Sequence, residues 1–147
     1  MIFSMGALTL KNLSEDWGVK LWSLTFDLPN EKANIFKKEV MEEFRELLKE
    51  LHERGKNKEI DALIFVSAKK NIFIAGADIN MILATKTAEE ATQLAAEGQE
   101  ILNQWEDLPF PRVMAIDGAC MGGGCELSLA SSAILMSKNP AAKIGLP

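Results

Sequence analysis

Residues 113–132, VMAIDGACMGGGCELSLASS, hold the pattern that decides the fold. The first four are apolar and predict a short buried strand, residues 118–124 are rich in glycine, and the last eight are compatible with a helix. Consecutive glycines cost conformational entropy, so they indicate a positive φ angle or a close approach of the backbone. The amides of Gly122, Gly123 and Gly124 would lie at a helix N-terminus, where unpaired N–H groups favour negative charge.

A second loop of the same kind comes earlier in the chain. A brief apolar strand at 71–75 ends in Gly76, Ala77 and Asp78. Gly76 precedes Gly122 by 46 residues, and both glycines follow an apolar strand. Two copies cannot prove a period, so this spacing is only a hint of a repeated strand–strand–helix unit.

The other segments alternate between helix and strand patterns. Strands that alternate with helices favour an α/β fold class with parallel pairing. The N-terminal part is the exception, because it predicts an antiparallel hairpin. Apolar and polar residues alternate in the strand at 20–26, and Leu8 and Leu10 suggest a partner strand. Turn formers that include Gly18 lie between the two. The expected helices are 36–54, stopped by Gly55, and 87–105, and the further strands are 20–26, 62–68, 113–116, 133–136 and 143–145.

Composition narrows the function classes. The 147 residues allow one domain or a piece of a larger one, and 48% hydrophobic with 25% charged residues is typical of a globular protein. A net charge of −5 lacks the basic surplus of a nucleic-acid binder. Cys120 and Cys125 have neither metal-site nor disulfide-framework spacing, so we expect reduced thiols and a cytoplasmic location. No signal peptide or membrane span is visible.

Familiar catalytic motifs are absent. The glycines match no P-loop, dinucleotide fingerprint or nucleophile elbow. His52 is expected at the surface of a helix, and the two cysteines are expected to be packing residues, so no nucleophile–base pair and no metal site is predicted. Two donor loops and Glu126 remain. Glu126 is either a functional acid or a helix-dipole and capping partner, and Asp78 is expected to cap the following turn.

At these same residues the sequence resembles the enoyl-CoA hydratase/isomerase (crotonase) superfamily, in particular the hydratase region of α-subunits of bacterial fatty-acid oxidation complexes. Four ordered matches are more specific than one glycine loop. The matching segments are FIAGADIN at 73–80, EDLPFP at 106–111, AIDGACMGGGCEL at 115–127 and KIGLP at 143–147.

The resemblance implies a crotonase-like spiral of strand–strand–helix repeats that binds an acyl-CoA thioester, with coenzyme A as part of the substrate and no separate cofactor. It gives Ala77 and Gly123 as the two amides of an oxyanion hole, and Glu126 as one of two catalytic glutamates. It also implies a homo-oligomer or a complex with a thiolase subunit. The substrate-binding positions that go with it are Ala75, Gly76, Asp78, Gly122 and Lys70. For Lys70, which would meet the phosphates of coenzyme A, the alternative is a solvated surface lysine.

One departure from the family pattern concerns the second glutamate, which follows a Gly-x-Pro sequence in the hydratases. Here that sequence is Gly145 to Pro147, the last residue given. We therefore expect residues 1–147 to be the N-terminal, truncated part of a hydratase domain, with little or no activity by itself. The alternative is a catalytically silent acyl-CoA-binding or assembly module, and double-bond isomerisation is a further reaction open to the family. Ser131 and Ser132 stand where many relatives have an acidic or other polar residue after the short helix.

Overall fold

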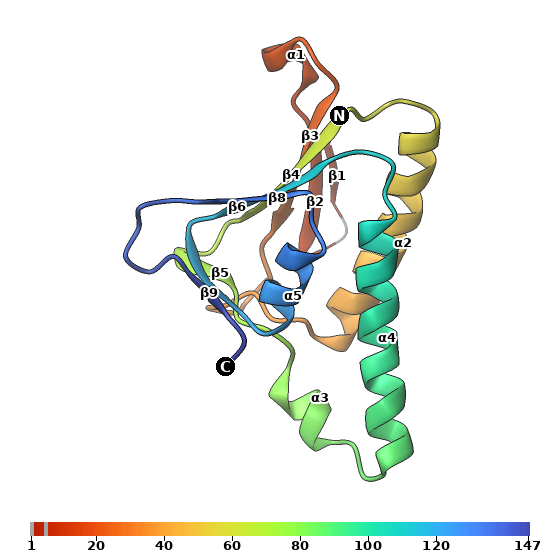
Figure 1. Cartoon of the computed structure of the whole chain (residues 1–147), viewed down its shortest axis with the longest axis vertical. Helices are drawn as coiled ribbons and strands as arrows, with labels where there is room; N and C mark the ends of the chain where they lie inside the picture. Colours follow the sequence, from red (N-terminus) through yellow and green to blue (C-terminus); the bar gives the residue numbers. More distant parts are fainter. Residues whose placement is uncertain (1, 5) are drawn as a thin grey trace.

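The computed structural model describes residues 2–4 and 6–147, in which two β-sheets are flanked by helices (Figure 1). The larger sheet has six strands in the order β1-β2-β3-β4-β6-β8, and the smaller has three in the order β5-β7-β9. The strands are β1 (Ile2–Ser4), β2 (Leu8–Asn12), β3 (Leu21–Phe26), β4 (Ala62–Ser67), β5 (Asn71–Ile74), β6 (Arg112–Ile116), β7 (Gly118–Met121), β8 (Ala133–Met136) and β9 (Lys143–Gly145). The helices are α1 (Ser14–Trp17), α2 (Lys38–Lys56), α3 (Ile79–Leu83), α4 (Ala88–Glu106) and α5 (Gly123–Leu129).

The antiparallel hairpin at the N-terminal end is confirmed. β2 pairs with β3 in a register that sets Leu8 opposite Phe26 and Leu10 opposite Leu24, and all four side chains are buried. The segment that we expected to be only a turn contains α1, which ends at Gly18 in the left-handed conformation (φ 67°). β1, which we did not predict, adds a third antiparallel strand beside β2.

Parallel pairing begins at β3. β4 pairs with β3, β6 with β4 and β8 with β6, all in the parallel sense. The central register sets Leu24, Phe65 and Met114 side by side, each no more than 1% exposed. In β3, β4 and β6 only alternate residues are buried, so these strands are covered on one face. The apolar run at 62–68, which does not alternate, predicted a strand covered on both faces, and that expectation was wrong.

The hint of a repeated unit is confirmed by the two sheets. Each of the pairs β4–β5, β6–β7 and β8–β9 gives its first strand to the large sheet and its second to the small one. β5, β7 and β9 are parallel neighbours, so the glycine loops that follow β5 and β7 lie at the same end of the small sheet. The chain is thus a spiral of strand–strand–helix turns.

Gly118, the first residue of the glycine-rich stretch, begins β7, a strand that we did not predict. A Cβ atom at this glycine would lie 2.3 Å from the carbonyl carbon of Asn71 and 2.4 Å from the amide nitrogen of Ile72. Such distances are not tolerated between a side chain and backbone, so the glycine allows β7 to approach β5.

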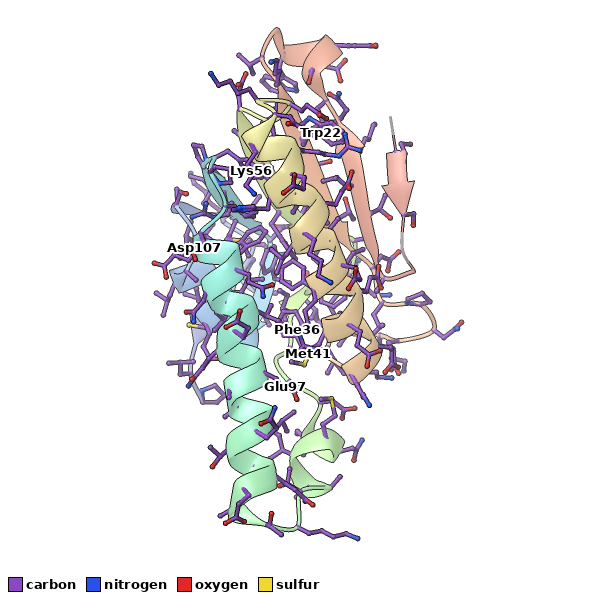
Figure 2. All side chains as sticks on the ribbon, turned by 90° about the vertical axis from the view of Figure 1, so that its right-hand side faces the viewer. Trp22, Phe36, Met41, Lys56, Glu97 and Asp107 are labelled. Carbon is purple, nitrogen blue, oxygen red and sulfur yellow. The ribbon has the colours of Figure 1, made fainter. Side chains whose placement is uncertain are left out.

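Helices α2 and α4 lie side by side against the sheets (Figure 2). The ring of Phe44 on α2 meets that of Trp105 on α4 at 5.7 Å between centroids. The expected stop at Gly55 was wrong, because α2 continues to Lys56. Gly55 therefore lies inside the helix and does not end it. A Cβ at this position would be 2.5 Å from Pro109, so the close approach of that side chain explains the glycine.

Two apolar regions stay exposed. α3 and the first half of α4 extend beyond the sheets (Figure 1), and Ile79 and Leu83 of α3 are largely exposed. β8 forms one edge of the large sheet, and all four of its side chains are exposed. No helix in the described part of the chain is both long and apolar enough to cross a bilayer.

Candidate functional site

The first donor loop is held by the segment that precedes α2. Phe36 donates its N–H to the carbonyl of Gly76 (2.9 Å) and accepts from the N–H of Asp78 (3.2 Å). These two bonds form a parallel bridge centred on Ala77, which turns the N–H of Ala77 itself to the opposite side. Within the described ranges that N–H has no acceptor, so it is free to donate to another molecule.

The second donor loop opens α5. Gly122 has a φ of 53° and precedes the helix as its N-cap residue, and its carbonyl accepts the N–H of Glu126 (3.0 Å). Gly123 is the first helical residue, and its N–H is one of the four that an α-helix leaves unpaired. No acceptor for it is found among residues 2–4 and 6–147.

The two loops touch each other. A Cβ atom at Gly76 would lie 3.3 Å from the carbonyl oxygen of Met121 and 3.8 Å from the amide nitrogen of Gly123. Gly76 also has a φ of 113°, which side chains with a Cβ rarely adopt. Its lack of a side chain therefore lets the loop after β5 pack against the start of α5.

Gly124 has a packing role. A Cβ there would be 2.6 Å from Cβ of Ile74, so this glycine brings α5 close to β5. The triple glycine thus serves a tight turn at Gly122 and close helix packing at Gly124, while Gly123 leaves an N–H exposed to a pocket.

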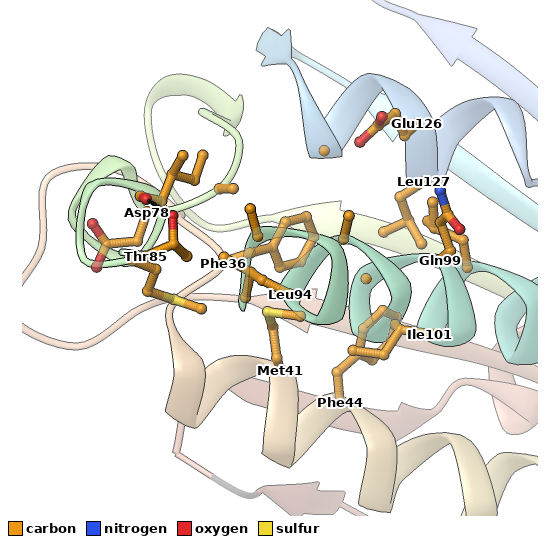
Figure 3. Close-up of a pocket in the computed structure, with 18 residues that line it drawn as sticks. Phe36, Met41, Phe44, Asp78, Thr85, Leu94, Gln99, Ile101, Glu126 and Leu127 are labelled. Atoms are coloured by element: carbon orange, nitrogen blue, oxygen red, sulfur yellow. Dashed lines mark hydrogen bonds between the residues drawn. The ribbon is translucent and has the colours of Figure 1, made fainter. Parts of the chain in front are cut away.

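A pocket of about 390 Å³ lies beside the two loops (Figure 3). Ala77 and Gly123 line it together with Glu126, and its other walls come mainly from α2, α3 and α4. The walls are largely apolar. They include Phe36, Met41, Phe44, Met81, Ile82, Ala91, Leu94, Ala95, Gly98, Ile101, Leu102 and Leu127, with Asp78, Thr85 and Gln99 as the further polar members.

Glu126 lies on the first turn of α5, with its side chain at the pocket (Figure 3). The side chain is exposed, and it makes no hydrogen bond or ion pair with any described residue. Its Oε2 atom is 3.8 Å from the place where a Cβ of Gly123 would be. The capping interpretation therefore has no hydrogen bond to support it, and only the helix-dipole contribution remains.

Asp78 caps α3, as predicted. Its side chain accepts the N–H of Asn80 at 2.9 Å, the usual N-cap interaction. The carboxylate is thereby engaged in local structure, although the residue also borders the pocket.

The other four predicted binding residues, Ala75, Gly76, Gly122 and Lys70, do not line the pocket, although Gly76 and Gly122 lie in the two donor loops. Ala75 is exposed, and its N–H donates to the carbonyl of Asn34 (2.8 Å). Lys70 is exposed and has no ion pair with a described residue. Its neighbour Lys69 is bound to Asp27 (2.6 Å) and to the carbonyl of Leu28 (2.7 Å).

Sequence reasoning missed Asn34, which holds the first donor loop in place. Its side chain is fully buried and donates to the carbonyls of Phe26 (2.8 Å) and Phe73 (3.3 Å), and its Oδ1 accepts from Leu28 (2.9 Å). Its carbonyl accepts the N–H of Ala75. No signal in the sequence identifies it, because its partners lie on separate strands.

The remaining reactive side chains do not form a second site. Cys120 and Cys125 are free and buried, and burial raises the pKa of the Cys120 thiol. His52 is half-buried on α2 rather than fully exposed, and it does not line the pocket. Ser131 accepts a hydrogen bond from Trp105 (2.8 Å). The described residues contain no cluster of three His, Cys, Asp or Glu side chains suited to a metal ion.

Comparison with known proteins identifies the family. Residues 19–147 match the enoyl-CoA hydratase/isomerase family. The fold is similar to that of an enoyl-CoA hydratase from Geobacillus kaustophilus (24% identity, TM-score 0.84), with 100% of this chain and 51% of that one covered. It is also similar to DspI from Pseudomonas aeruginosa (26% identity, TM-score 0.80; 98% and 54% covered) and to the enoyl-CoA hydratase of Bacillus anthracis (23% identity, TM-score 0.80; 95% and 50% covered).

This chain therefore spans about half the length of the solved structures that it matches. The family match, in contrast, extends over most of the chain, from the start of the parallel strands to the last residue. The chain belongs to the enoyl-CoA hydratase/isomerase family.

Proposed function

We propose that this chain supplies the thioester-binding part of an enoyl-CoA hydratase site, in which the N–H groups of Ala77 and Gly123 donate to the thioester oxygen. The observation that supports this most strongly is the contact between two loops, each with an unbonded N–H, at the edge of one apolar pocket. Such a pair is suited to an oxygen that gains negative charge during a reaction.

The proposed reaction explains why these donors matter. When water adds across a double bond conjugated to a thioester, electron density moves onto the thioester oxygen. Two fixed N–H groups stabilise that charge without having to reorient, and the first turn of α5 adds the positive end of a helix dipole. We propose 2-enoyl-CoA thioesters of fatty-acid β-oxidation as the substrates, with double-bond isomerisation as a related reaction of the same site.

Glu126 is the proposed acid or base beside those donors. Its carboxylate has no partner among the described residues and lies next to Gly123, so it can bind a water molecule or accept a proton from the substrate. A second carboxylate is part of the proposed hydration chemistry. Assembly with further copies or with a thiolase subunit, and a cytoplasmic location, stay predictions from the resemblance.

The proposal can be tested by removing one donor without removing the loop. Gly123 is the first residue of α5, a position that accepts proline because its N–H has no helical partner. Gly123→Pro deletes the N–H, whereas Gly123→Ala adds a Cβ but keeps the N–H. The alanine variant is the matched control, since both side chains place a Cβ about 3.1 Å from Phe36.

Binding of crotonyl-CoA by the wild-type chain and both variants is measured by calorimetry, with infrared spectroscopy of the thioester carbonyl. We expect the wild type and Gly123→Ala to lower the carbonyl frequency, and Gly123→Pro to lose much of that change and about two- to tenfold in affinity. A thioether analogue without the carbonyl should bind all three proteins equally. Equal carbonyl frequencies in the two variants would contradict the assignment of Gly123.

A further inference from the structure

The pocket extends well beyond the two donor loops. From Ala77 and Gly123 it runs between α2 and α4, where Met41 and Phe44 lie on one side and Leu94 on the other (Figure 3). Its walls in this part are apolar. A thioester that is held at the loops would therefore direct its acyl chain, rather than its polar coenzyme A portion, into this space.

A glycine in the middle of α4 borders this part of the pocket. Gly98 lies in the interior of a helix that runs from Ala88 to Glu106, where glycine is less favourable than alanine. Packing within the described chain does not explain it, because a Cβ at Gly98 would meet no described atom within 4 Å. Gly55, the other glycine inside a long helix of the described chain, is required by contact with Pro109.

The neighbours of Gly98 on the same face of α4 are also small. Ala91 and Ala95 precede it by seven and three positions, which sets them along one side of the helix, and all three border the pocket. The empty volume beside Gly98 is thus continuous with the space next to the donor loops. A methyl group at this position would enter the pocket without meeting any described atom within 4 Å.

We propose that Gly98 keeps the acyl-chain pocket open, and that the site prefers unbranched acyl groups longer than butyryl; this inference rests on the proposed thioester-binding function. A methylene group occupies about as much space as a water molecule, about 30 Å³. A pocket of about 390 Å³ therefore has room for several more such groups than a butyryl chain supplies. Short acyl groups leave most of it empty and gain little from its walls.

The test compares decanoyl-CoA, butyryl-CoA and free coenzyme A in binding to the wild-type chain, Gly98→Leu and Ala96→Leu. Ala96 is exposed on α4 and does not line the pocket, so its variant makes the same kind of enlargement outside the pocket. Each buried methylene strengthens binding about fourfold, so half-burial of six more methylenes predicts a preference for decanoyl-CoA on the order of fiftyfold. Gly98→Leu should weaken decanoyl-CoA binding at least about tenfold, leave butyryl-CoA within about twofold, and retain the wild-type circular dichroism spectrum.

The outcomes separate the two proposals. If both acyl-CoAs bind more tightly than coenzyme A but equally well, or if Gly98→Leu and Ala96→Leu behave alike, the inference about Gly98 is overturned and the thioester site stands. If neither acyl-CoA binds more tightly than coenzyme A, the proposed function fails and the inference fails with it.

Discussion

Asn34→Asp tests the buried hydrogen bonds that hold the first donor loop. The substitution keeps the size of the side chain and the acceptor for the N–H of Leu28. It removes the amide that donates to the carbonyls of Phe26 and Phe73 and to the hydroxyl of Ser67. At neutral pH it also creates a carboxylate in a position with no solvent exposure.

The expected loss of stability is large. A buried acceptor without its donor costs about 1–3 kcal/mol, and a buried charge without a partner costs about 3–5 kcal/mol. Because the chain can relax in part, we expect a total of about 3–5 kcal/mol, not the sum of every bond. For a chain of this size that lowers the Tm by roughly 6–20 °C.

Urea unfolding at neutral pH, followed by circular dichroism, measures this loss, and Asn103→Asp is the control. Asn103 is exposed on α4 and its side chain has no described partner, so the same chemical change there should cost less than about 1 kcal/mol. Hydrogen exchange at the amide of Ala75 should also accelerate in Asn34→Asp, since the carbonyl of Asn34 is its acceptor. If Asn34→Asp is within about 1 kcal/mol of the wild type, the role assigned to Asn34 is wrong.

Three further substitutions address the packing of the small sheet, the proposed acid and the buried thiol. Gly118→Ala should destabilise the chain by about 3 kcal/mol or more, because its Cβ would lie 2.3 Å from the backbone of Asn71; a thermal melt close to that of the wild type would contradict the close approach. Glu126→Gln should cost only about 0.3–1 kcal/mol in urea unfolding, from the helix dipole, yet lower kcat about 10²- to 10⁴-fold in a chain that carries the complete family domain; a large loss of stability with kcat preserved would favour the structural role instead. Burial raises the pKa of the Cys120 thiol, so the folded chain keeps this proton to a higher pH than the unfolded chain does. The resulting contribution to the free energy of unfolding is present below about pH 8.5, and it is lost as the pH rises through the folded-state pKa. Between about pH 8 and pH 10 the wild type should therefore lose more stability in urea than Cys120→Ala, and parallel losses would show that the thiol does not contribute.

The parts of the fold that sequence predicted best are those with strong local patterns. The faces of α2 and α4 follow from apolar spacing, and the strands at 62–68 and 113–116 follow from short apolar runs, with ends that differ by one or two residues. β7 was not predicted, because its first residue, Gly118, has no intrinsic preference for a strand. Its conformation is decided by the neighbouring backbone of β5, which lies far away in the sequence.

For the candidate site, the loops were predictable and their supports were not. Positive φ angles at Gly76 and Gly122 agree with the expectation that each glycine follows a strand in a loop of special geometry. Asn34 and Gly98 carried no such signal. The first is recognised only by its burial among separate strands, and the second only by the empty volume beside it.

The exposed edge at β8 has a practical consequence for handling this chain. Its four residues, AILM, are apolar and uncharged, and on the side away from β6 they offer backbone N–H and C=O groups to which the described chain adds no further strand. Such an edge pairs readily with extended segments of other molecules. Lys138 and Pro140, which follow the strand, are the nearby residues that oppose aggregation. We expect self-association to begin at β8 and to rise with protein concentration, so a charged residue at Leu135, which is 63% exposed, would improve solubility without disturbing the core.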